Sequence, residues 1–299
     1  MKKSSVSERS SSSSDSPATF CFESPLWSSL SLRTFYFTTP HRHVADAEFY
    51  RLLERVRLAT EEEGAMICDA LAEQAKDHGR GIDEDDDVVH LRAKLSETAS
   101  INEMGLKSEP LYSSTRRTYT AEDEGSKEEL RSSPSLPSLE LCVGCKVLLI
   151  KNLSLGLGLI NGSMGRVERF TSDGLPIVNF AVLGEDGGME EVRRTIRVEE
   201  FTVSRGGGGK GKAATAVSSR RLQIPLIHGY ALSVHKCQGM TLSRASIDLR
   251  GFFEFGQAYV AISRVRGREG LSFVGKGGGR FCHWKVRRFY QGLEALKGS

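Results

Sequence analysis

The sequence predicts an α/β protein whose main sheet is interrupted by a β-rich segment. Residues 229–234 and 246–249 are short apolar runs that look like buried strands of an α/β sheet, and residues 257–263 have the length of a helix. Between residues 139 and 198 the pattern changes to short strands separated by turns that contain Gly or Asn-Gly, as in hairpins. A chain of 299 residues is long enough for both parts.

Two helices are predicted in the first third of the chain. In residues 46–58, Phe49, Leu52, Leu53 and Val56 recur at helical spacing and form one apolar stripe. Thr60 and Glu63 have the spacing of a capping box, which opens a second helix. The other expected elements are strands at 34–37, 88–91, 146–150, 165–170, 176–180, 193–198 and 271–274, and helices at 97–106 and 283–296.

Composition excludes several classes of protein. Hydrophobic residues make up 39% of the chain and charged residues 26%, which fits a folded protein with a core. No stretch of 18 apolar residues is present, so we expect no membrane-spanning helix. Residues 1–17 are dominated by serine and lack the apolar core of a secretory signal, and we expect them to be a disordered leader.

The net charge of +3 conceals an asymmetry along the chain. From residue 201 onward there are 17 Lys and Arg against 4 Asp and Glu, whereas the first 200 residues hold 24 basic and 34 acidic residues. A basic third of this kind suits binding to nucleic acid or another polyanion. An ordinary solvated surface explains the charge equally well, so charge alone does not decide.

Three features that suggest ligand sites have simpler explanations. Cys142 and Cys145 have metal-like spacing, but no second pair follows, and both lie in an apolar run; we interpret them as core residues, with zinc as the alternative. Residues 206–213 nearly match a phosphate-binding loop, but Ala213 stands where a Ser or Thr must contact Mg²⁺. The acidic run 83–87 is interpreted as a solvated loop, so no metal site is predicted.

Two segments near the C-terminus carry more specific chemistry. In the first, an apolar strand ends in His235-Lys236-Cys237-Gln238-Gly239, which offers donors to anionic oxygens and a glycine that lets backbone approach a phosphate. The second, residues 256–266, is a short helix that presents Arg264 just beyond its end. Each residue alone is usually a surface or capping residue. An ordinary surface role does not explain the order and separation of these residues in the sequence.

These segments resemble motifs V and VI of the petite-integration-frequency (Pif-one-type) DNA helicases, the 5′→3′ branch of the superfamily-one helicases. The resemblance extends over most of the chain. Residues 40–43, Pro-His-Arg-His, lie where the family has motif IV, although His43 replaces the usual Gln. Residues 142–167 resemble the strand and hairpin that lead into a small inserted β-barrel, and residues 20–27 resemble the segment after motif III.

The resemblance implies a fold and a domain order. The fold is the second RecA-like lobe of a superfamily-one helicase with an inserted small β-barrel. The expected parts are a serine-rich leader at 1–17, a remnant of the first lobe at 18–30, the second lobe at 31–150 and 215–275, the barrel with a Gly-rich loop at 151–214, and a C-terminal helix at 276–299.

The resemblance also implies roles for individual residues. Arg42 and Arg264 would be catalytic, converging at one rim of the sheet to place positive charge on the phosphates of ATP. Gln238, Gly239 and Gln257 would contact the nucleotide or couple it to DNA. His235, Lys236 and Thr241 would contact the single strand. The complete family enzyme uses ATP and Mg²⁺ to unwind DNA in replication, recombination, repair or telomere maintenance, in the nucleus or the mitochondrion.

The 299 residues contain no acceptable phosphate-binding loop and no Asp-Glu motif for Mg²⁺. We therefore expect that the chain alone binds neither ATP nor Mg²⁺ tightly and has no helicase activity. Its expected partners are single-stranded DNA or DNA junctions and a missing first lobe. A truncated gene, a degenerate paralogue and a half-enzyme completed in trans all fit, and the abrupt start favours truncation. The alternative function is a non-catalytic module that binds single-stranded nucleic acid through its basic C-terminal third.

Overall fold

The structure is a computed structural model that describes residues 20–33, 35, 43, 46–77, 88–183, 189–203, 219–275 and 278–295. Residues 1–40 and 41–299 form two separate units. In the first unit, α1 (Pro25–Ser29) begins at Ser24, whose hydroxyl accepts a hydrogen bond from the amide of Leu26. The serine-rich leader, Arg42, most of the expected strand 34–37, the acidic run 83–87 and the glycine-rich loop 206–216 lie outside the described residues.

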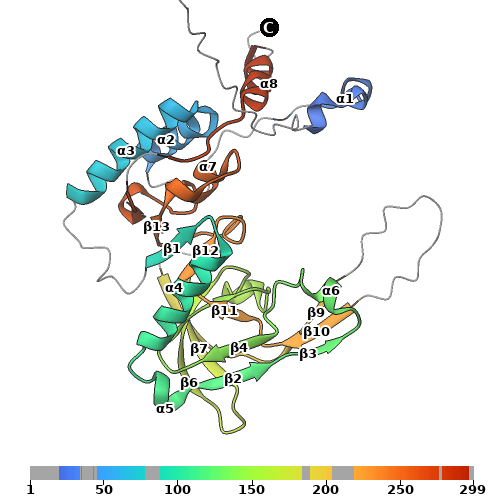
Figure 1. Cartoon of the computed structure of the whole chain (residues 1–299), viewed down its shortest axis with the longest axis vertical. Coiled ribbons are helices and arrows are strands. Elements are labelled where there is room, and N and C mark those ends of the chain that lie inside the picture. Colours follow the sequence, from blue (N-terminus) through green and yellow to red (C-terminus); the bar gives the residue numbers. More distant parts are fainter. Residues whose placement is uncertain are drawn as a thin grey trace, which may run out of the picture. The chain divides into compact units, whose positions relative to one another are not determined.

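The second unit is built on a parallel sheet of four strands in the order β12-β1-β13-β14, as predicted for an α/β protein (Figure 1). Its strands are β1 (Val88–Arg92), β12 (Ala231–Ser233), β13 (Arg244–Ile247) and β14 (Leu271–Phe273). Because all four run the same way, the loops that follow them emerge at one edge, where open α/β sheets bind ligands.

Helices α2 (Ala47–Leu58), α3 (Glu61–Asp77) and α7 (Gln257–Ile262) supply one side of the core around this sheet. Phe49, Leu53 and Val56 of the predicted stripe are buried there. The predicted capping box is present, because the amide of Glu63 donates to the Thr60 hydroxyl and the Glu63 carboxylate accepts from the Thr60 amide. Local sequence signals thus placed these helices correctly.

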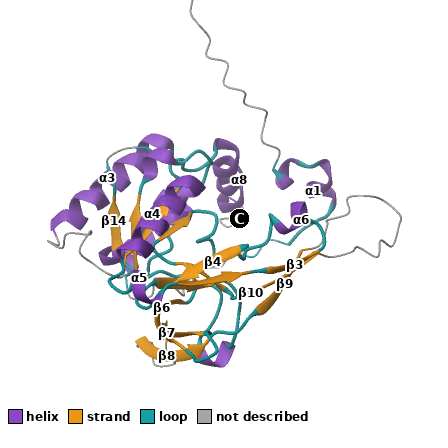
Figure 2. Ribbon diagram, turned by 60° about the horizontal axis from the view of Figure 1, so that its bottom comes forward, coloured by secondary structure: helices purple, strands orange, loops and turns teal. Residues whose placement is uncertain are grey.

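The β-rich segment forms an antiparallel sheet of five strands in the order β11-β5-β6-β7-β8, of which Figure 2 labels β6, β7 and β8. The strands are β5 (Lys146–Leu149), β6 (Met164–Phe170), β7 (Pro176–Leu183), β8 (Met189–Thr195) and β11 (Leu226–His228). Within the described residues no pairing joins β8 to β11, so a closed barrel is not confirmed. The sheet also includes strands from both sides of the expected boundary at residue 150.

Two smaller antiparallel ribbons extend from this sheet. One pairs β2 (Arg117–Thr120) with β4 (Ser138–Leu141), and the other pairs β3 (Glu122–Glu124), β10 (Ser219–Gln223) and β9 (Glu199–Val203). The short helix α5 (Tyr112–Thr115) precedes β2, and the short helix α6 (Lys127–Leu130) follows β3. The Arg221 guanidinium, buried in the second ribbon, bonds both carboxylate oxygens of Asp123 at 2.7 Å.

The last helix, α8 (Trp284–Ala295), is anchored by the segment that precedes it. The amide of Gly256 donates to the carbonyl of Phe281 at 2.6 Å, and the amide of Cys282 donates to the carbonyl of Ala59. Phe281 is buried in the same core as α2 and α3. No helix within the described residues combines the length and apolar character that a bilayer crossing requires.

Several expected strands differ in their bounds from those observed, and two show why. The strand expected at 229–234 is shorter, because β12 covers only Ala231–Ser233, and residues 229 and 230 form a bend between it and β11, which belongs to another sheet. Tyr230, between them, turns its hydroxyl to Glu109 at 2.5 Å. The strand expected at 193–198 lies earlier, at Met189–Thr195, where its pairing with β7 is continuous. In both cases the partner strand determines the bounds.

Candidate functional site

The loop that follows β12 keeps its apolar side chains inside and its polar ones outside. Cys237 and Met240 are buried, and the amide of Cys237 closes the turn by donating to the carbonyl of Ser233 at 3.1 Å. With these two side chains anchored, His235, Lys236, Gln238, Gly239 and Thr241 are exposed. The residues of this loop that were expected to contact nucleotide or DNA are therefore accessible at the carboxyl edge of the parallel sheet.

Gly239 and Cys237 explain the shape of this loop. Gly239 has a φ of +85° with no atom near the position of a Cβ, so the backbone conformation requires glycine but the space around it is open. Burial raises the pKa of the Cys237 thiol to about 11, which keeps it a neutral core residue. The loop therefore exposes its backbone at Gly239, close to the buried and neutral side chain of Cys237.

His235 lies against the loop that follows β13. Its Nε2 is 2.9 Å from a carboxylate oxygen of Glu254, and both side chains are more than half exposed. An exposed pair of this kind contributes less than about 1 kcal/mol to stability, so it constrains neither partner strongly. The loops after β12 and β13 are in contact through this pair.

Arg264, the predicted catalytic arginine of the last motif, follows α7 and is only 8% exposed. Its Nε donates to the carbonyl of Val260 at 2.7 Å, and its terminal nitrogens donate to the Ser263 hydroxyl and the carbonyl of Met240. Burial lowers the pKa of this guanidinium. Among the described residues, the hydrogen-bond acceptors of this guanidinium are the uncharged oxygens of Val260, Met240 and Ser263.

The three motif-like segments meet at two consecutive peptide groups. The amide of Leu242, after the first motif-like loop, donates to the carbonyl of Arg264 at 2.9 Å. The Nε2 of His43 lies 3.0 Å from the carbonyl of Val265. Residues 43 and 265 are separated by most of the chain. The fold therefore places His43, which adjoins Arg42 in sequence, in contact with Val265, which adjoins Arg264. The side chain of Arg42 lies outside the described residues.

Gln257 holds a neighbouring loop through its side chain. Its side chain is 4% exposed, and its Oε1 accepts hydrogen bonds from the amides of Phe253 and Glu254. It therefore holds the loop after β13 in place from inside. Its Nε2 has no hydrogen-bond partner within the described residues. A contact between Gln257 and nucleotide stays a prediction.

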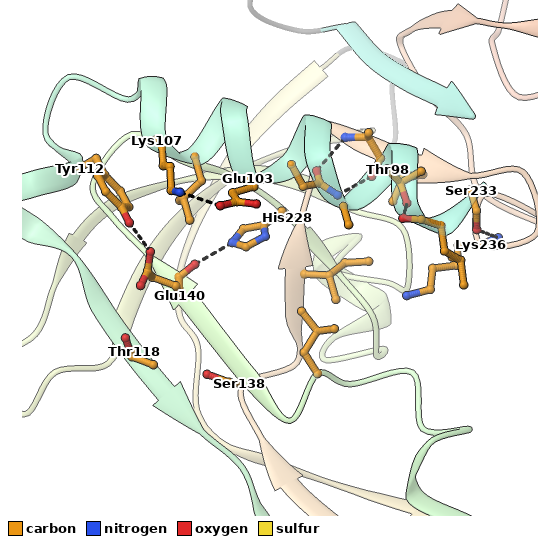
Figure 3. A pocket seen from close by; sticks show the side chains of 18 of the residues that line it. Thr98, Glu103, Lys107, Tyr112, Thr118, Ser138, Glu140, His228, Ser233 and Lys236 are labelled. Carbon is orange, nitrogen blue, oxygen red and sulfur yellow. Dashed lines mark hydrogen bonds and ion pairs between the residues drawn. The ribbon is translucent and has the colours of Figure 1, made fainter. Parts of the chain in front are cut away.

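A groove of about 780 Å³ extends from Lys236 along α4 (Leu95–Ser108) and faces β2, β4 and β11 (Figure 3). Leu95, Ala99 and Leu232 contribute apolar surface, and Lys107, Arg116 and Lys236 contribute positive charge. Lys107 pairs with Glu103 at 2.6 Å, whereas Lys236 is exposed at the other end of the groove. An apolar surface with basic groups along its length fits the bases and phosphates of a single strand.

Polar contacts hold the two walls of the groove. The side-chain amide of Asn102 on α4 donates a hydrogen bond to the carbonyl of Ala231 and accepts one from the amide of Ala231. It therefore makes the hydrogen bonds that a neighbouring strand would make at this edge of β12. On the other side, His228 bonds the carbonyl of Glu140 at 2.7 Å, and burial lowers the pKa of the His228 imidazole. Sequence reasoning missed this groove, because its walls come from segments more than a hundred residues apart.

Cys142 and Cys145 are fully buried, in agreement with the core interpretation. The amide of Cys142 donates to Sγ of Cys145, and the turn between them uses Gly144 at a φ of +92°. In the described part of the chain, no cluster of three or more His, Cys, Asp or Glu residues is arranged to hold a metal ion.

Comparison with known proteins agrees with this arrangement. Residues 132–170 match the family model described as DNA helicase Pif1, 2B domain. The chain is 34% identical over 264 residues to the ATP-dependent DNA helicase PIF1 of Homo sapiens, and 33% identical over 262 residues to PIF6 of Trypanosoma brucei brucei. The chain is a homologue of the Pif1 DNA helicases. These matches cover 85% and 84% of the chain, but 37% and 30% of the two relatives.

Solved structures of Pif1 helicases have the same fold. The crystal structure of Pif1 from Candida albicans superimposes with a TM-score of 0.68 at 26% identity, covering 92% of this chain and 64% of that one. A Bacteroides Pif1 in complex with ADP-AlF3 and single-stranded DNA gives a TM-score of 0.55 at 24% identity. The resemblance deduced from the motifs is thus confirmed for the family and for its α/β fold with mixed sheets.

Proposed function

We propose that this chain provides the second lobe of an ATP-dependent 5′→3′ DNA helicase of the Pif1 type. One observation carries the proposal: the three motif-like segments converge on the consecutive carbonyls of Arg264 and Val265, which bond the Leu242 amide and the His43 imidazole. This is the arrangement that a site needs if residues 42 and 264 are to act on one triphosphate. ATP and Mg²⁺ would be held by a first lobe outside these 299 residues, in the same polypeptide or in trans.

Within the complete enzyme the residues divide into two groups. Arg264 and Arg42 would place positive charge on the γ-phosphoryl oxygens, an effect that supplies about 10³- to 10⁵-fold in rate. His235, Lys236 and Thr241 would hold the backbone of single-stranded DNA, and the groove along α4 would continue that track. Gln238 and Gly239, between the two groups in sequence, would couple nucleotide to DNA. As a DNA helicase, the enzyme would act in the nucleus or the mitochondrion.

The test joins the chain to the first lobe of a Pif1 relative and measures DNA-dependent phosphate release with Mg²⁺. We expect the chain alone to give background rates and the fused protein to turn over. Arg264→Ala should reduce that turnover by about 10³-fold or more. Arg51→Ala, which changes an exposed arginine on α2, is the matched control. Turnover that survives Arg264→Ala, or turnover by the chain alone, would overturn the proposal.

The burial of Arg264 favours a second candidate, a helicase-derived module that binds single-stranded nucleic acid without catalysis. Its guanidinium is turned onto the carbonyls of Val260 and Met240, so reaching a phosphate requires these bonds to break. This candidate predicts that the chain binds single strands as tightly after Arg264→Ala as before, and that the fused protein stays at background. Measuring both properties on the same variant separates the two functions.

A further inference from the structure

Three large aromatic side chains are exposed on two segments that the fold brings together. Phe253 is 56% exposed, Phe255 48% and Trp284 56%, whereas their neighbour Phe252 is buried. Single exposed apolar residues are normal on protein surfaces, but a group of aromatic rings marks an interaction site. The question is which partner this surface fits.

Each of the three rings lies beside a histidine, and the two groups that result are joined through the backbone of residues 253–255. Phe255 meets His283 edge-on at 4.8 Å between ring centroids, and His283 is stacked with Trp284 at 5.9 Å. At the other end, Phe253 lies 6.4 Å from the ring of His235. We call Phe253, Phe255 and Trp284, with these two histidines, the aromatic row.

Positive charge accompanies the aromatic row. The guanidinium of Arg280 lies over the ring of Phe255 at 5.3 Å, and the ammonium of Lys285 lies 5.8 Å from the ring of Trp284. The His235 end adjoins the exposed Lys236. Two carboxylates adjoin the row: Glu254 is paired with His235, and Glu61 is paired with Arg280 at 2.7 Å.

The fold holds the row at the ligand-binding edge of the parallel sheet. Its members come from the loops after β12 and β13 and from the segment after β14. The backbone bonds from Gly256 to Phe281 and from Ala258 to Arg280 fasten the last two segments together. Gln257 fixes the amides of Phe253 and Glu254 from beneath. The rings are therefore presented on a rigid support.

We propose that the aromatic row is a platform on which bases of a single-stranded nucleic acid stack, beyond the backbone contacts expected at His235 and Lys236. The inference rests on the proposed function, because it assumes that this chain binds single strands. Exposed rings beside cations favour a polyanion with π-faces over a protein surface, which would bury the rings against apolar groups. Each stacked base strengthens binding by roughly 5- to 150-fold in known sites.

The experiment uses the 299-residue chain with Trp27→Phe. The sequence holds two tryptophans, so Trp284 then becomes the single fluorescent reporter. Affinities are measured for an oligothymidylate and for an abasic oligonucleotide of equal length, which has the phosphates but not the bases. We expect Trp284 emission to be quenched by the oligothymidylate and not by the abasic strand.

Substitutions separate stacking from charge. Phe255→Ala should weaken binding of the oligothymidylate by roughly 5- to 150-fold and change abasic binding by less than twofold, whereas Phe255→Tyr should retain the affinity. Lys236→Ala should weaken both strands alike. Leu155→Ala removes a side chain that is 76% exposed outside the row, and it should change neither affinity.

The outcomes distinguish this inference from the proposed function. If the chain binds the oligothymidylate but Phe253→Ala, Phe255→Ala and Trp284→Ala bind it as tightly, the aromatic row is not a platform, and the proposed function stands. If the unsubstituted chain binds no single strand, the proposed function fails as well. If Phe255→Ala instead impairs only association with the first lobe of a Pif1 relative, the row is a protein interface and the inference is overturned.

Discussion

The imidazole of His43 bonds the carbonyl of Val265 at 3.0 Å, joining two segments separated by most of the chain. His43 is 7% exposed and also meets the ring of Phe49 edge-on at 5.4 Å. A single buried side chain thus links the segment that contains Arg42 to the segment that contains Arg264.

We therefore expect His43→Ala to destabilise the protein. It removes a buried ring and leaves the Val265 carbonyl without this donor, which together cost about 2–4 kcal/mol in the free energy of unfolding. His43→Gln keeps a donor and should cost less than half as much. Urea denaturation followed by circular dichroism measures both. His235→Ala, in an exposed histidine, is the control, and an equal loss there would contradict this role for His43.

Asn102 should be equally sensitive, for a different reason. Its side chain satisfies both the amide and the carbonyl of Ala231 at the edge of β12. Asn102→Ala leaves both groups unpaired and should cost about 2–4 kcal/mol in the free energy of unfolding. Asn102→Asp keeps the acceptor but loses the donor, so it should also destabilise. Ser100→Ala, on the exposed face of α4, should change stability by less than about 0.5 kcal/mol.

The same substitution at two helical glycines should have opposite signs. A Cβ at Gly105 would lie 2.5 Å from the ring of Tyr230, whose hydroxyl is already engaged with Glu109. Gly105→Ala should therefore destabilise by about 1–3 kcal/mol, despite the better helix propensity of alanine. Gly292, in α8, has open space around it, so Gly292→Ala should stabilise by about 0.5–1 kcal/mol. Urea midpoints that move in the same direction would refute the packing explanation.

Stability should fall between pH 7 and pH 5 because of His228. Burial lowers the pKa of its imidazole below 6.5 in the folded state, so the unfolded chain takes up a proton first as the pH falls. The stabilisation is complete above the unfolded pKa and is lost as the pH decreases toward the folded pKa. Urea midpoints across this range should depend less on pH in His228→Gln. The aspartates and glutamates whose pKa is lowered, such as Asp123 and Glu124, titrate at lower pH.

Lys236 should contribute to DNA affinity through charge. Its ammonium is exposed at the mouth of the groove along α4. Lys236→Ala should weaken single-strand binding and reduce the slope of log affinity against log salt by about 0.7. Fluorescence anisotropy at several salt concentrations measures the slope. Lys94→Ala, in an exposed lysine paired with Glu97, is the comparison and should leave the slope unchanged.

Local patterns were enough for much of the fold. The apolar stripe from Phe49 to Val56 and the capping box at Thr60 predicted α2 and the start of α3, because both depend on residues within one or two turns. The order of the motif-like segments near Lys236 and Arg264 was also sufficient to recognise the family, which the homologues confirm. Strand bounds were less accurate, since they depend on partners elsewhere in the chain.

The sequence by itself therefore determined the class of fold, the family and which polar residues are candidates for the site. Only the tertiary structure decided that the β-rich segment is an open sheet within the described residues, that His43 bonds Val265, and that Arg264 is turned inward. It also gathered Phe253, Phe255 and Trp284 at one edge. The physical reason is that propensity and periodicity act over a few residues, whereas these features arise from contacts between segments far apart in the chain.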